Sequence, residues 1–240
     1  MIINNVKLVL ENEVVHGSLE VQDGEIRAFA ESQSRLPEAM DGEGGWLLPG
    51  LIELHTDNLD KFFTPRPKVD WPAHSAMSSH DALMVASGIT TVLDAVAIGD
   101  VRDGGDRLEN LEKMINAIEE TRKRGVNRAE HRLHLRCELP HHTTLPLFEK
   151  LAQLGLLDIL SSDYYPASLL DAAFRVADDQ SNRFTLPQAV RLVTKNPAQA
   201  LNLQDRGVIG EGNRADLVLA HRKGNHIHID HVWRQGKRVF

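Results

Sequence analysis

The chain has 240 residues, 42% of them hydrophobic, and a formal net charge of −7 at pH 7, so it can bury a core as globular proteins do. The acidic net charge argues against a nucleic-acid binder, because most of the surface would repel the backbone phosphates of a nucleic acid. The most apolar stretch, Leu83–Gly99, falls short of a membrane span. The single Cys137 excludes an internal disulfide and the first residues lack a secretion-signal pattern, so we expect a soluble cytoplasmic protein.

The chain begins with predicted β-structure and then reaches its most informative strand. Residues 1–30 alternate β-branched runs with polar turns, including Asp23-Gly24, which predicts a β-meander. The apolar run Leu48–Asp57 then places His55 and Asp57 two positions apart. Alternate strand residues face the same side, and such nitrogen and oxygen donors hold divalent metals. The run therefore predicts a metal-hydrolase site, with structural roles for both residues as the alternative.

The middle of the chain alternates strand and helix patterns. Apolar strand runs followed by helical periodicity imply parallel strands with right-handed crossovers. The expected elements are strand Leu51–Leu54, helix Ser79–Ala86, strand Ile89–Ala97, helix Arg107–Lys123, strand Arg132–Leu139, helix Leu145–Leu154 and strand Asp158–Ser161.

The carboxyl-terminal region returns to β-structure. Strand patterns appear in Asp216–Ala220, Ile227–Ile229 and Val232–Phe240, separated by glycine and asparagine. This alternation of short strands and turns matches that of residues 1–30, so we expect both chain ends to share one small β-sandwich. Four histidines of this region alternate like strand surface residues, and we assign them no chemistry: His221, His226, His228 and His231.

Three separated pieces of sequence resemble the amidohydrolase superfamily. They are the strand Leu48–Asp57, the strand end Ser161–Asp163, and Asn196–Leu203 followed by Gly207–Val218. The resemblance implies an α/β fold in which a (β/α)8 barrel holds one or two divalent metal ions. It also implies a small β-sandwich, built from both chain ends, beside the barrel.

The barrel expected from this resemblance is incomplete. Positions 51 to 196 hold 146 residues, whereas a complete (β/α)8 barrel enzyme has about 250. Only four barrel strands are recognisable, and the missing strand-helix units would lie between Glu149 and Gly155. We expect residues 1–48 with 202–240 to form the sandwich domain and residues 49–201 a partial TIM-like barrel.

Within the superfamily, the likeness is to diphosphatases of bacterial phosphonate degradation. It lies in Glu53–Lys61, His131–Glu138 and Ser161–Pro166. Asp57 stands where the superfamily usually has a second histidine. The resemblance implies a phosphorylated ribose phosphonate as substrate, with hydrolysis of its triphosphate arm and release of diphosphate.

The resemblance also implies roles for individual residues. The metal ligands would be His55, Asp57, Glu138 and Asp163, with zinc, manganese or magnesium as the ion. Asp163 would be the general base. The alternatives are a surface glutamate at Glu138 and a turn cap at Asp163. One of His141 and His142 is a further candidate ligand, because adjacent strand residues face opposite sides.

The substrate and the shortening leave several possibilities open. Lys61, Arg66 and Lys68 follow the first ligand strand and are candidate phosphate contacts, although the nearby prolines mark an exposed loop. An incomplete barrel exposes sheet edges, so a homodimer is possible. The alternatives to the diphosphatase are a catalytically inactive remnant that acts as a binding module, and an amide or cyclic-amide hydrolase.

Overall fold

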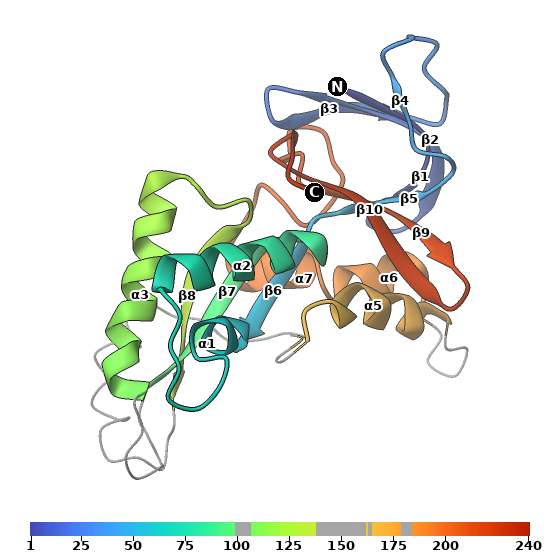
Figure 1. The fold of residues 1–240 in the computed structure, drawn as a ribbon. Coiled ribbons are helices and arrows are strands. Elements are labelled where there is room, and N and C mark those ends of the chain that lie inside the picture. The colour runs from blue at the N-terminus through green and yellow to red at the C-terminus, as the bar shows by residue number, and fades with distance from the viewer. Residues whose placement is uncertain (99–106, 138–161, 163–164, 179–183) are drawn as a thin grey trace.

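The computed structural model describes residues 1–98, 107–137, 162, 165–178 and 184–240. In these parts the strands form two sheets, one of eight strands and one of three. Figure 1 shows the eight-stranded sheet at the upper right, with both termini, and the three-stranded sheet among the helices. No helix of the described residues is both long and apolar enough to cross a membrane.

The eight-stranded sheet joins the two ends of the chain. Its strand order is β11-β10-β9-β5-β1-β2-β3, and β4 lies beside β1. The bounds are β1 Ile2–Val9, β2 Val14–Gln22, β3 Glu25–Ala30, β4 Met40–Asp41, β5 Trp46–Pro49, β9 Leu217–Lys223, β10 His226–Arg234 and β11 Lys237–Arg238. The sheet is mixed, because β5 runs parallel to β1 and antiparallel to β9.

Strand β5 links two hydrophobic cores. Leu47 packs with Leu8 and Trp233 in one cluster, while its neighbour Leu48 packs with Val218 in another. Consecutive strand side chains point to opposite faces, so a short apolar strand can serve both clusters. Strands from both ends of the chain thus pair in one sheet, and the expected β-sandwich domain stays a prediction.

The three-stranded sheet is parallel, with strand order β6-β7-β8. Its strands are β6 Leu51–Thr56, β7 Ile89–Ile98 and β8 Glu130–Cys137. Helices α1 (Asn58–Phe63), α2 (Ala73–Ala86) and α3 (Arg107–Arg124) contribute to a cluster on one face that includes Met77, Val96 and Ile118. On the other face, Leu54 and Leu93 pack against Ala198.

Three further helices precede β9 in the part of the chain that the structure describes. They are α5 Ser168–Asp178, α6 Leu186–Arg191 and α7 Lys195–Ala200. Leu169 and Phe174 of α5 join the cluster that contains Leu48. Helix α6 begins with a capping box, in which Thr185 Oγ1 accepts from the Gln188 backbone N–H and Gln188 Oε1 accepts from that of Thr185. The T-x-x-Q signature of that cap is present in the sequence.

A partly buried ion-pair network joins β8 to the segment before β9. Arg206 Nη1 donates to Glu130 Oε2 at 2.6 Å, and Arg214 Nη1 donates to the same oxygen at 2.8 Å. Burial alone would raise the pKa of Glu130, but hydrogen bonds from Arg214, Arg206 and Arg132 hold it well below its usual range. Glu130 is therefore a fixed anchor for this part of the chain.

The predicted elements of the middle region hold with changed boundaries. Helix α2 starts at Ala73, after Pro72, rather than at Ser79, and β8 starts at Glu130 rather than Arg132. The short helix α1 was not predicted, because six residues give too little periodicity. The expected helix 145–154 and strand 158–161 lie outside the described residues.

Candidate metal centre and substrate pocket

Polar side chains converge at the carboxyl ends of the three parallel strands. His55 lies near the end of β6, and Asp57 follows that strand directly. On β8, His134 pairs with Ala95 of β7 and Arg136 pairs with Ala97. The residues on β8 are two apart, so they share a face, and the alanines leave room for side chains to meet across β7.

Two imidazole rings meet across this face. The rings of His55 and His134 lie edge to face, with centroids 4.9 Å apart and planes at 81°. The Nδ1 atom of His134 donates to the Leu54 carbonyl oxygen at 2.7 Å. Burial lowers the pKa of His134, which favours the neutral ring. A neutral imidazole is the form that binds a metal.

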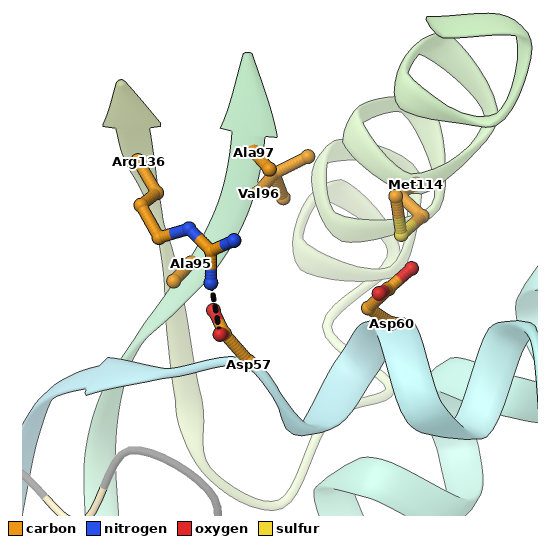
Figure 2. A pocket seen from close by; sticks show the side chains of 7 residues that line it. All are labelled: Asp57, Asp60, Ala95, Val96, Ala97, Met114 and Arg136. Carbon is orange, nitrogen blue, oxygen red and sulfur yellow. Dashed lines mark hydrogen bonds and ion pairs between the residues drawn. The ribbon is translucent and has the colours of Figure 1, made fainter. Parts of the chain in front are cut away.

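Asp57 lies beside His55 and forms an ion pair. One of its oxygens is 3.7 Å from His55 Nε2, and the other accepts from Arg136 Nη1. Figure 2 shows Asp57 pointing toward Arg136, with Asp60 directed into the same pocket. The residues that line the pocket are Asp57, Asp60, Ala95, Val96, Ala97, Met114 and Arg136. The pocket thus combines two carboxylates with one guanidinium.

A buried carboxylate fixes the backbone beside the pocket. Glu53 has no exposed surface, and its Oε1 accepts from the His55 backbone N–H at 3.0 Å. Its Oε2 accepts from the Ser162 backbone N–H at 2.9 Å. Glu53 therefore holds the end of β6 and the residue before Asp163 together. Asp163 itself lies outside the described residues, as do Glu138, His141 and His142.

A second group of histidine and aspartate side chains is buried on the helix face of the sheet. Asp94 of β7 accepts from His80 Nε2 at 2.6 Å and from His131 Nδ1 at 2.8 Å. His131 Nε2 lies 3.1 Å from Asp81 Oδ1. His80, Asp94 and His131 are the group within the described residues whose donor atoms lie close enough together to hold a metal ion.

The ionisation of this group follows from its burial and pairing. Burial alone would lower the pKa of His131, but the charges of Asp94 and Asp81 raise it to about 9. Burial alone would raise the pKa of Asp94, which the two imidazoles hold far below its usual range. Protons shared between the imidazole nitrogens and the carboxylates already occupy the places where a metal ion would bind, so the ion would have to displace these protons.

The structure places the other sequence candidates away from the pocket. Lys61 is exposed on α1, and Arg66 and Lys68 are exposed between α1 and α2. None of the three is among the pocket-lining residues. In the carboxyl-terminal sheet, Asp230 accepts from His221 Nδ1 at 2.6 Å and from His228 Nδ1 at 3.1 Å.

Sequence reasoning missed the roles of several residues that the fold brings together. His134 and Arg136 share the two-residue spacing of His55 and Asp57, and that spacing was the available signal. For Asp94 the available signal was a charged residue inside an apolar strand, since such a residue, when buried, requires a partner.

Comparison with known proteins gives close sequence similarity to one enzyme. The model of the amidohydrolase family matches residues 128–240. The chain is 62% identical to the alpha-D-ribose 1-methylphosphonate 5-triphosphate diphosphatase of Escherichia coli K12, over 378 aligned positions that cover 100% of both chains. The alignment has 138 more positions than the chain has residues (378 against 240). The chain is therefore shortened relative to that enzyme.

Solved structures with similar folds are distant in sequence. The N-isopropylammelide isopropylaminohydrolase of Burkholderia multivorans is 15% identical, with a TM-score of 0.69 and coverage of 99% of this chain and 97% of that one. The N-acetylglucosamine-6-phosphate deacetylase of Thermotoga maritima is 14% identical, with a TM-score of 0.64 and coverage of 100% and 99%. These likenesses show an α/β fold of the amidohydrolase type.

Proposed function

Because the chain belongs to the amidohydrolase family, we propose that it hydrolyses α-D-ribose 1-methylphosphonate 5-triphosphate to diphosphate and ribose 1-methylphosphonate 5-phosphate. The observation that carries this proposal is the 62% identity to the diphosphatase over the whole of both chains. The reaction adds water across one phosphoric anhydride bond. The water oxygen bonds to one phosphorus and its proton passes to a base. The bridging oxygen keeps the electron pair of the broken P–O bond and leaves on the other phosphorus.

The pocket supports a metal-dependent reaction. Two of its polar lining residues, Asp57 and Asp60, are carboxylates that would repel a triphosphate. A divalent cation bound beside them supplies positive charge that stabilises the charge developing on the phosphate oxygens. The imidazole of His55 is a ligand that zinc prefers, whereas the carboxylate of Asp57 is a ligand for zinc, manganese or magnesium.

The chain's own residues divide the remaining tasks. His55, Asp57, Glu138 and Asp163 form the proposed ligand set, and Asp163 also accepts the proton of the attacking water. Arg136, in the pocket wall, offers a planar guanidinium that can bind a phosphate through two hydrogen bonds. Glu53 supports this set by fixing the His55 backbone and the residue before Asp163.

The proposal includes an architecture for the shortened chain. Strands β6, β7 and β8 would belong to an incomplete (β/α)8 barrel, residues 49–201, and the sheet of residues 1–48 with 202–240 would be the sandwich domain. Within the described residues, β6 and β8 each pair with β7 alone. A second copy could cover such an edge, so we include a homodimer and a cytoplasmic location in the proposal.

Diphosphate release is the test. The purified chain would be incubated with the triphosphate substrate and Zn²⁺, Mn²⁺ or Mg²⁺ in turn, with products followed by phosphorus NMR. We expect equal amounts of diphosphate and the 5-phosphate, and their loss on chelation. Hydrolysis of a cyclic amide without any diphosphate would contradict the proposed substrate. The mass in solution tests the dimer.

A further inference from the structure

We propose that His134 is a metal ligand that binds the same divalent cation as His55 and Asp57, through its Nε2 atom. This inference rests on the proposed metal-dependent hydrolysis and adds a ligand from the middle of β8. It concerns a residue for which the sequence predicted no role. Three features of the geometry support it.

The first feature is the fixed tautomer of the His134 ring. Its Nδ1 atom lies 2.7 Å from the carbonyl oxygen of Leu54, and a carbonyl oxygen only accepts hydrogen bonds. In the neutral ring the proton is therefore on Nδ1, and Nε2 carries the lone pair. A backbone carbonyl that holds one ring nitrogen while the other binds metal is the usual support of a histidine ligand.

The second feature is the spacing of the donor groups. Two imidazoles on one tetrahedral cation, each bound at about 2.0–2.1 Å, have ring centroids about 5 Å apart. The centroids of His55 and His134 are 4.9 Å apart. Donor atoms that share such a cation lie about 3.0–3.5 Å from each other. His55 Nε2 and Asp57 Oδ1 are 3.7 Å apart. The donor atoms of His55, Asp57 and His134 do not all lie within 4.8 Å of one another, so a bound cation would have to draw them closer together.

The third feature is the small residue between the two rings. His134 is on β8 and His55 on β6, and β7 lies between these strands. The β7 residue paired with His134 is Ala95, which is 3% exposed. A longer side chain at this position would occupy the space that the rings share. The register of β7 and β8 thus permits a site that spans three strands.

Paired substitutions separate a metal ligand from a structural ring contact. Asparagine retains a donor near the Nδ1 position, whereas glutamine reaches toward Nε2 without the bond to Leu54. His134→Asn should therefore preserve folding and lose metal, and His134→Gln should retain more metal than His134→Asn. His226→Asn is the matched control, because the His226 side chain is 78% exposed.

The measurements are the dissociation constants for Zn²⁺ and Co²⁺ and the visible absorption of the Co²⁺ form. We expect His134→Asn to weaken binding at least 100-fold, since loss of even an outer partner costs about 10–100-fold, and to change the Co²⁺ spectrum. The control should bind like the unaltered chain. Equal affinity and spectrum in His134→Asn, or no metal bound by the unaltered chain, would overturn the assignment. Metal bound through His134 without diphosphate release would refute the proposed function alone.

Discussion

Raising the pH from 6.5 to 9.5 should destabilise the protein through His131, whose ring lies between two buried carboxylates. Burial opposes its charge, but Asp94 and Asp81 raise the pKa of His131 from 6.5 to about 9. A group whose pKa is higher in the folded state than in the unfolded state contributes its full stabilisation of the fold at pH values below the unfolded-state pKa. This stabilisation is lost as the pH rises through the folded-state pKa. The difference between the two pKa values corresponds to about 3 kcal/mol.

Urea unfolding at several pH values would measure this loss. The free energy of unfolding of the unaltered chain should fall by about 3 kcal/mol more than that of His131→Gln over this range, because other titrating groups are common to both. Nitrogen NMR of the histidine rings provides a second measurement if the variant does not fold. Equal pH dependence in the two proteins, or a singly protonated His131 ring at pH 8, would refute the reasoning.

Three further predictions concern other parts of the molecule. His55→Ala should abolish stoichiometric metal binding, measured by elemental analysis, and retained metal would exclude His55 as a ligand. Gly50→Ala should lower the free energy of unfolding by about 1–3 kcal/mol, and the melting temperature with it, because a Cβ there would lie 2.2 Å from Thr90 Oγ1. The loss of stability should be smaller in a Thr90→Ala background. Arg206→Met should destabilise the chain by about 1–3 kcal/mol, since it removes one of three arginine partners of the half-buried Glu130; a change below about 1 kcal/mol in denaturant unfolding would contradict this.

Local periodicity was enough to predict most of the described strands and the longest helix. The apolar run from Ile89 was expected to end at Ala97, and β7 ends at Ile98. The charged helix predicted over 107–123 is α3, Arg107–Arg124. These segments carry their pattern over many residues, so little depends on the rest of the fold. Helix α2 was predicted too short because Pro72 was not taken as its start signal.

The site could be predicted only in part, because its members come from different elements. His55 and Asp57 are two apart on one strand, so spacing alone puts them on one side. His134 approaches His55 only through the register of three strands. Likewise, Asp94 meets His131 across 37 positions. Single-strand spacing carries no information on such contacts, and the ligand roles of Glu138 and Asp163 stay predictions.

The pairing of β5 with β9 has a consequence for how the chain tolerates changes in length. Leu47 pairs with Leu219, so this contact closes a loop of about 170 residues in the unfolded chain. Loop-closure entropy grows only with the logarithm of length, and adding the 138 positions of the longer relative would cost about 0.5 kcal/mol. The entropic cost of forming this sheet from the two chain ends therefore changes little when a large internal segment is deleted. Selection against such a shortened chain would act on the segment between its ends and on the chemistry of that segment rather than on the pairing of the ends.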